Sequence, residues 1–163
     1  MQTLILAADA ALADDLAAAW RAGGTGSVDA ATLPALPSGG TPAVVFVPLG
    51  ALGLTAAPAA VAPAEARLRE LVAGADLVVV HLDALDGGTL HDGVLLLVAR
   101  VAGERALPVV VLAGSSDASR REWSGAGVSG VHEVGPGAGP RAAAVERVAR
   151  TWAPDEEQRS RAR

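Results

Sequence analysis

Short apolar runs alternate with helical patterns along this chain. Short stretches that are mostly apolar predict strands at Gln2–Ala7, Val28–Leu33, Ala43–Val47, Leu77–Val80, Val109–Leu112 and Gly130–Glu133. The stretch Leu77–Val80 is continuously apolar, which is typical of a buried parallel strand. Apolar residues at helical spacing predict helices over Leu12–Arg21, Ala64–Ala73, His91–Arg105, Asp117–Gly125 and Arg141–Trp152. This alternation favours an α/β fold with a mainly parallel sheet and right-handed crossovers.

The length of the chain indicates one domain. A chain of 163 residues can build one core but not two large lobes. The closing segment PDEEQRSRAR is charged and poor in apolar residues, so we expect residues 154–163 to form a disordered tail. Residues 1–153 are therefore predicted to be the folded domain.

Composition excludes several classes of site and partner. The chain has no cysteine, which excludes a disulfide framework and a thiolate nucleophile. All 13 basic residues are arginine, so a P-loop lysine and a lysine phosphate clamp are excluded as well. The net charge of -5 argues against general nucleic-acid binding, because phosphate neutralisation supplies most of that affinity.

The hydrophobic pattern of the sequence predicts neither a membrane-spanning helix nor a secretory signal. No apolar run approaches the roughly 20 residues that a membrane-spanning helix needs. The opening MQTLILAADAALADD lacks a basic region and turns acidic at once, which argues against a secretory signal. We therefore expect a cytoplasmic protein without a membrane role.

Residues 75–100 carry the most specific motif. Their sequence, ADLVVVHLDALDGGTLHDGVLLLVAR, resembles without a gap the segment that two-domain glycerate kinases write ADLVITGEGRxDxQTLxGKxPxGVAR. Asp76, Asp86, Thr89 and Arg100 keep their places in the frame. The polar GEGR of the family is HLDA here, however, and its Gly-Lys is Asp-Gly. The resemblance implies a relative that has kept the scaffold and lost much of the reactive chemistry.

Further segments resemble the same family. PVVVLAGS at 108–115 is similar to its PVxAxAGS, AGVSGVH at 126–132 to its AGIDAVFSI, and LILAAD at 4–9 to its opening VxIAPDSFKG. The family folds a Rossmann-like domain from both chain ends and inserts a second domain between them. Its early segments run here to about Leu54 and its late segments resume near Ala64. The resemblance thus implies a single Rossmann-like domain from which the inserted domain has been deleted.

The carboxyl ends of the strands are the expected place of a ligand site, as in other open parallel sheets. We expect this edge to carry the candidate polar residues Asp9, Gly39, Gly40, His81, Asp83, Asp86, Thr89, Gly114 and Ser115. Asp86 is the catalytic candidate, because it aligns with the motif aspartate, and the others are candidates for ligand binding. In the sequence Asp-Gly-Gly-Thr, Asp86 is equally typical of a turn or of a cap for the following helix. Thr89 is a second candidate for the N-cap.

Other signals at this edge are weaker. The histidines and carboxylates between residues 81 and 92 match no established ligand spacing, so we expect no metal site. Backbone amides of Gly114 and Ser115 could hold an anion at a helix N-terminus, with Asp117 as the cap of that helix. Gly39 and Gly40 give a weak phosphate-loop signal.

Three functional hypotheses follow. The leading one is a non-catalytic binding or interaction module, because the motif arginine and all lysines are absent and phosphoryl transfer depends on such cations. The second is a reduced kinase for glycerate or a similar hydroxy acid, which would use ATP and Mg²⁺. The third is another small-molecule enzyme that uses the crevice at the sheet edge. We expect no cofactor for the leading hypothesis.

Deletion of a domain also predicts a partner. Its loss would expose apolar surface, and exposed apolar patches usually bind another protein. We therefore expect a homo-oligomer or a protein partner, with the uncharged segment Ala56–Pro63 or an adjacent sheet edge at the contact. A small anionic ligand is a further expectation for the sheet edge.

Overall fold

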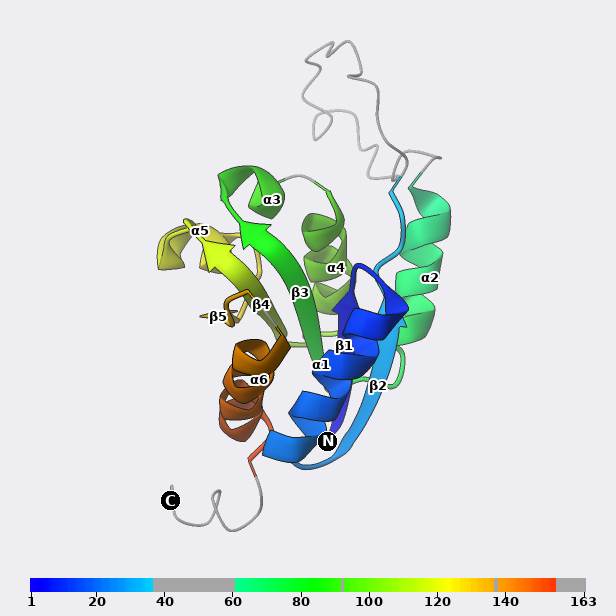
Figure 1. Ribbon diagram of the computed structural model, residues 1–163. Helices are drawn as coiled ribbons and strands as arrows, with labels where there is room; N and C mark the ends of the chain where they lie inside the picture. Colours follow the sequence, from blue (N-terminus) through cyan, green and yellow to red (C-terminus); the bar gives the residue numbers. More distant parts are fainter. Residues whose placement is uncertain (37–60, 92, 137, 155–163) are drawn as a thin grey trace, which may run out of the picture.

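The computed structural model of the protein describes residues 1–36, 61–91, 93–136 and 138–154 (Figure 1). Its centre is a five-stranded sheet of order β2-β1-β3-β4-β5, in which all neighbouring strands are parallel. The strands are β1 (Gln2–Ala7), β2 (Ser27–Thr32), β3 (Leu77–Leu85), β4 (Val109–Ser116) and β5 (Gly130–Glu133). The predicted α/β fold, a single Rossmann-like domain with a parallel sheet, is confirmed.

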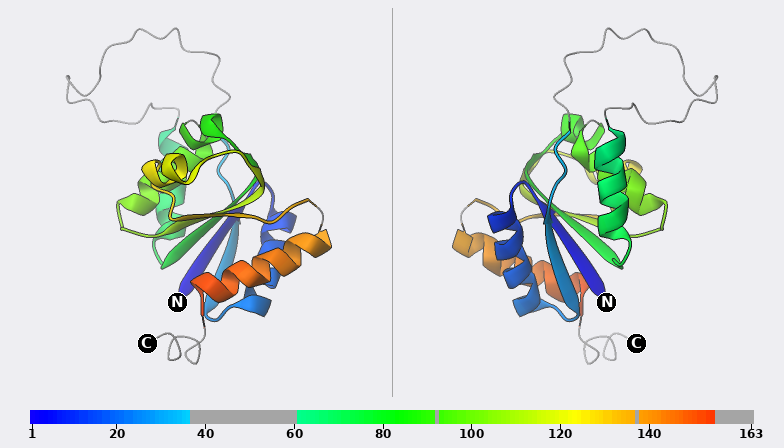
Figure 2. Two further views of the ribbon diagram at one scale, coloured as in Figure 1. Left: turned by 90° about the vertical axis from the view of Figure 1, so that its left-hand side faces the viewer. Right: turned by 90° about the vertical axis from the view of Figure 1, so that its right-hand side faces the viewer.

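Helices cover both faces of this sheet (Figure 2). The first and last helices pack on one face, and the four between them lie on the other. Their bounds are α1 (Ala10–Gly23), α2 (Ala62–Val72), α3 (Gly87–His91), α4 (Val94–Gly103), α5 (Arg120–Gly125) and α6 (Ala138–Trp152). The sheet is therefore the middle of three layers.

Alternate side chains of the central strands enter two separate cores. Leu4 and Leu6 of β1 pack on the face of α2 and α4, whereas Ile5 packs on the face of α1 and α6. Val78 and Val79 of β3 divide in the same way. Because helices cover both faces, successive residues must all be apolar, which explains the continuous apolar runs in the sequence.

Small residues allow α6 to pack closely on its neighbours. A Cβ atom on Gly23, at the end of α1, would clash with the backbone carbonyl of Glu146 in α6. A Cβ atom on Gly130 in β5 would lie 2.6 Å from the ring of Trp152. Glycine is therefore required at both positions for the close approach of α6.

Several element boundaries differ from the prediction: β4, for example, continues to Ser116 instead of ending at Leu112. β3 continues to Leu85 instead of ending at Val80, because its ladder with β4 continues and Ala84 still lies opposite Ser115. The single helix predicted from residue 91 to 105 is instead α3 and α4. Gly93, which precedes α4, has a φ of 85°, a left-handed conformation that an α-helix cannot contain.

The start of α5 also differs, because Ser119 and not Asp117 is its N-cap. The Ser119 hydroxyl accepts a hydrogen bond from the amide of Glu122 at 3.4 Å. In return, the Glu122 carboxylate accepts one from the amide of Ser119 at 2.7 Å. This capping box fixes the first helical residue at Arg120, so the predicted capping role of Asp117 is wrong.

Some predictions fall outside the described residues. They concern the strand Ala43–Val47, the glycine pair Gly39–Gly40, most of the segment Ala56–Pro63, and residues 155–163 of the tail. Among the helices that the structure describes, none is both long and apolar enough to cross a membrane.

Candidate functional site

The carboxyl edge of the sheet contains the switch point of the fold. β1 has β2 on one side and β3 on the other. The order in which strands are added to the sheet therefore reverses between β1 and β3. Ligands of open α/β sheets bind outside the strand ends at such a point. Asp9 is the second residue after β1, Asp83 lies near the end of β3, and Asp86 directly follows β3. These three aspartates lie at the edge where the sequence predicted them.

Asp9 is the N-cap of α1. Its backbone is extended, with φ of -139° and ψ of 166°, and its carboxylate accepts a hydrogen bond from the amide of Leu12 at 2.9 Å. Helix N-termini leave such amides without a partner, so an aspartate at this position stabilises the first turn. The aspartate that resembles the family opening therefore serves the start of α1.

Asp86 and Thr89 form a reciprocal cap at the start of α3. The amide of Thr89 donates to the Asp86 carboxylate at 2.8 Å, and the amide of Asp86 donates to the Thr89 hydroxyl at 2.8 Å. Hydrogen bonds from the backbone and side chain of Thr89 hold the pKa of Asp86 below its ordinary value. Asp86 is thus the N-cap of α3. Thr89, three residues later, is its hydrogen-bond partner, and the prediction of Thr89 as the N-cap is wrong.

Gly114 and Ser115 belong to β4 and not to a helix N-terminus. Ser115 lies opposite Ala84 in the ladder with β3. A Cβ atom on Gly114 would lie 2.5 Å from the carbonyl oxygen of Asp83, so glycine is needed where β3 and β4 come together. The predicted position of these amides at a helix N-terminus is wrong, because α5 begins only at Arg120.

His81 lies inside the domain and not on the rim of the sheet. Only 2% of the residue is exposed, because β3 continues beyond it and helices cover the strand. Its Nε2 atom has no hydrogen-bond partner among the described residues. Burial lowers the pKa of His81, the positive charge of Arg141 lowers it further, and Asp83 acts in the opposite direction. The imidazole is therefore neutral at pH 7.

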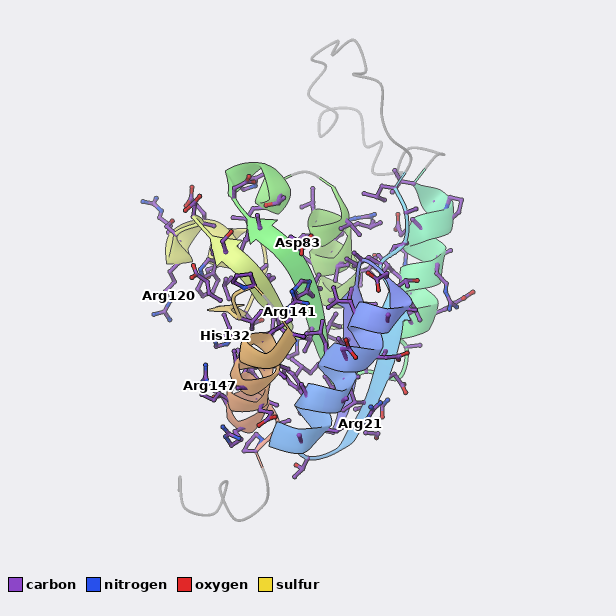
Figure 3. The ribbon with its side chains drawn as sticks, viewed as in Figure 1. Arg21, Asp83, Arg120, His132, Arg141 and Arg147 are labelled. Carbon is purple, nitrogen blue, oxygen red and sulfur yellow. The ribbon has the colours of Figure 1, made fainter. Side chains whose placement is uncertain are left out.

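Arg141 is a site residue that the sequence prediction missed. It lies in the first turn of α6, whereas Asp83 lies near the end of β3 (Figure 3), and the charges of both residues act on the pKa of His81. The residue is half-buried, and its Nε atom is buried without a hydrogen-bond partner in the described part of the chain. The sequence showed an arginine at the start of a helix. It could not show that this helix packs beside β3.

The described residues do not fit a metal–nucleotide complex. No group of three or more His, Asp or Glu among them could hold a metal ion. Asp9 and Asp86 are helix caps, and the Glu133 carboxylate accepts a hydrogen bond from the amide of Ser116 at 3.1 Å. Mg²⁺ in phosphoryl-transfer sites is normally held by carboxylates that are free to face the phosphates. Among the described residues, Asp83 and Arg141 are the charged groups that act on His81, and neither forms an ion pair.

Sequence comparison decides the family. The sequence model of the Glycerate kinase family matches residues 7–159, which is nearly the whole chain. The chain belongs to the glycerate kinase family. Among proteins with curated functions, none matches this sequence.

Two solved structures are similar to this glycerate kinase family member. A protein from Burkholderia thailandensis E264 assigned to pilus assembly (cpaE) is 15% identical, with a TM-score of 0.50. That match covers 100% of this chain and 99% of the other. A protein of Salmonella typhimurium LT2 assigned as glycerate kinase 2 is 24% identical, with a TM-score of 0.40. The second match covers 60% of this chain and 25% of the Salmonella protein. The first likeness supports the fold alone.

Proposed function

We propose that this member of the glycerate kinase family is a non-catalytic binding or interaction module. The main support for the proposal is that Asp86, the aspartate that aligns with the family motif, caps a helix. Its carboxylate accepts the amide of Thr89 at 2.8 Å and caps α3. The same hydrogen bonds lower its pKa, which makes the group a weaker base. A carboxylate held in this way is suited to a structural role.

The cationic groups of the motif support the same proposal. Ala84 stands where the family motif has the arginine of GEGR, and the chain contains no lysine. Loss of one cation that stabilises the transferring phosphoryl group can reduce the rate by factors on the order of 10³ to 10⁵. Loss of several such groups leaves little turnover, so the proposal includes neither ATP nor Mg²⁺ as a cofactor.

The proposal also includes a partner protein, and the support for this partner comes from the sequence. The uncharged segment Ala56–Pro63 stands where the family inserts its second domain. Within the described residues, Met1 and Leu96 are the exposed large hydrophobic side chains, at 45% and 44%. The broad apolar patch expected from the deletion is therefore absent from the described surface.

A coupled ADP-release assay tests the proposal. The full chain is incubated with D-glycerate, ATP and Mg²⁺, with a no-protein control and the Asp86→Ala variant alongside. We expect the same background rate in all three. A rate that increases with protein concentration and falls in Asp86→Ala would support the reduced kinase and reject the proposal.

A further inference from the structure

The outer edge of β5 presents backbone groups without a partner strand. β5 ends the strand order of the sheet, and the structure describes no strand beyond it. The amide of Val134, just after β5, donates to the carbonyl of Ala113 in β4 at 2.8 Å. Because successive residues of a strand turn their N–H and C=O groups to opposite sides, those of Val131 and Glu133 point away from β4. A further strand can pair with an edge of this kind.

The opposite edge of the sheet, formed by β2, is occupied at its start. The amide of Ser27 donates to the carbonyl of Met1 at 3.2 Å, so the backbone groups of Val28 point outward. The Val28 carbonyl accepts a hydrogen bond at 2.9 Å from the guanidinium of Arg21, at the end of α1 (Figure 3). Natural sheets cover their edges in such ways to prevent pairing. Among the described side chains, none covers the outward groups of β5 in this manner.

A hollow lies beside this open edge, between β5 and α6. Its volume is about 350 Å³, and its lining includes Val131 and Glu133 of the strand and Arg147 and Thr151 of the helix. Figure 2 (left) views the molecule from this side and shows β5 passing between α5 and α6. The hollow leaves room next to α6 for side chains of a strand that is added to the edge.

The charges at this edge are of both signs. Glu133 and Arg147 line the same hollow, yet neither forms an ion pair within the described part of the chain. The Glu133 carboxylate accepts the amide of Ser116 at 3.1 Å, which fixes the group and leaves its charge in place. In a two-fold interface each residue meets the same patch on the other copy, so such a patch must be complementary to itself. β2 has Asp29 as its one charge, and two-fold pairing there would bring like charges together.

From these observations we infer that two copies of the protein associate through β5, which pairs antiparallel with β5 of the second copy around a two-fold axis. The outward N–H and C=O groups of Val131 and Glu133 then hydrogen-bond across the axis, and the two sheets become one continuous sheet. On the face of α6, Arg147 of each copy meets Glu133 of the other. Because β5 has four residues, the interface is small and the dimer exchanges rapidly with the monomer.

The inference rests on the proposed function as an interaction module and names a second copy of the chain as its partner. The two can fail separately. Turnover in the ADP-release assay by a protein that dimerises through β5 would reject the proposed function alone. A protein that neither turns over nor dimerises would reject the present inference alone.

Amide hydrogen exchange tests the contact directly. Exchange in the full chain is followed by NMR from low to high micromolar concentration, with sedimentation velocity on the same samples. We expect the Val131 amide to exchange about tenfold more slowly where the dimer predominates, because pairing removes it from water. The Val134 amide is the internal control. It already donates to β4, so its exchange should change much less.

Three substitutions make the result specific. Val131→Pro removes an outward N–H and leaves the hydrogen bonds to β4, so it should abolish the dimer. Arg147→Glu should weaken the dimer about tenfold or more, because it places like charges across the interface, and adding Glu133→Arg should restore it. Arg67→Glu is the matched control, an exposed arginine on α2, away from β5 (Figure 1), and should dimerise as the wild type does.

Each outcome decides the question. Slower exchange of Val131 at high concentration, with a dimer that Arg147→Glu weakens and Arg67→Glu keeps, supports the inference. A monomer at every concentration overturns it, and so does a dimer in which Val131 exchanges at the rate of the monomer. Protection of Val131 in a monomer also overturns it, since the chain itself would then cover the edge. The charge variants give the same decision if Val131→Pro fails to fold.

Discussion

Arg100 of α4 binds the carboxylate of Glu65 in α2 with two hydrogen bonds, of 2.6 Å and 3.1 Å. Arg100 is the final residue of the motif that resembles the glycerate kinases, and Glu65 is 5% exposed. Arg69 also pairs with Glu65 and with Glu104, which extends the contact into a network. A retained motif residue thus joins the two helices on one face of the sheet.

This network predicts a pH-dependent contribution to stability. The hydrogen bond from Arg100 is the main reason why the pKa of Glu65 lies below its ordinary value of 4.5. Because the folded state lowers this pKa, the stabilisation is complete above pH 4.5 and is lost as the pH falls through the folded pKa. We expect Glu65→Gln to lower the melting temperature at pH 7 and to have a smaller effect at pH 3.

A double-mutant cycle isolates the pair. The losses from Glu65→Gln and Arg100→Gln should not add in the double variant, because each change removes the same interaction. Additive losses in urea unfolding would contradict the structural role of Arg100.

Gly23 provides a test of the packing between α1 and α6. Gly23→Ala places a Cβ atom against the backbone carbonyl of Glu146, which cannot move without shifting α6. We expect a destabilisation of about 1–3 kcal/mol in urea unfolding, as in other overpacked sites. Gly103→Ala is the matched control at the end of α4, where no atom lies within 4 Å of the added Cβ. An equal effect of the two changes would refute this packing.

The pair His132 and Trp152 predicts a second pH effect. Trp152 Nε1 donates a hydrogen bond to His132 Nε2 at 3.0 Å, so the imidazole must be neutral at that atom. Burial lowers the pKa of His132 below its ordinary value of 6.5. The unfolded state then binds more protons as the pH falls below 6.5, so stability decreases from there through the folded pKa.

We expect the free energy of unfolding to fall between pH 7 and pH 5, with a smaller slope in His132→Phe. His81, whose pKa is lowered in the same direction, contributes to the slope that remains in this variant, and carboxylates with a lowered pKa, such as Glu65, add to it near pH 5. An unchanged slope in His132→Phe would mean that the hydrogen bond to Trp152 does not control titration of the imidazole.

Two substitutions of Asp86 should differ in their effect on the melting temperature. Asp86→Ala removes the acceptor for the Thr89 amide and should lower the melting temperature, whereas Asp86→Asn keeps a good N-cap and should change it little. Neither change should alter any rate of ADP release. Equal melting temperatures for both variants would show that the cap contributes nothing.

The oligomeric state tests the partner expectation. We expect light scattering at high micromolar concentration to detect a dimer, or a pull-down from cells to recover a protein bound near the uncharged segment Ala56–Pro63. A monomer at that concentration, with no protein recovered, would remove the partner from the proposal.

The buried strands were the most predictable part of the fold. Val78, Val79 and Val80 are continuously apolar because helices cover both faces of β3, and this constraint acts on every residue in turn. The break between α3 and α4 was not predictable. It depends on the φ of 85° at Gly93, and a glycine alone does not reveal whether the chain uses that freedom.

The site was predictable only in part. Asp86 was predicted as a candidate cap as well as a catalytic group, since the local sequence contains both the cap and its partner Thr89. The burial of His81 depends on the ladder that β3 and β4 continue beyond it. The position of Arg141 depends on the packing of α6 against a strand that is 60 residues away in the chain (141 against 81). Such tertiary relations leave no local pattern.

We propose that this member of the glycerate kinase family performs no phosphoryl transfer. The most direct measurement is the formation of phosphoglycerate by phosphorus NMR, after long incubation of concentrated protein with D-glycerate, ATP and Mg²⁺. We predict ATP and its spontaneous hydrolysis products alone, with the same spectrum for Asp86→Ala and for the sample without protein. A phosphoglycerate resonance that grows with protein concentration and is absent in Asp86→Ala would contradict the account.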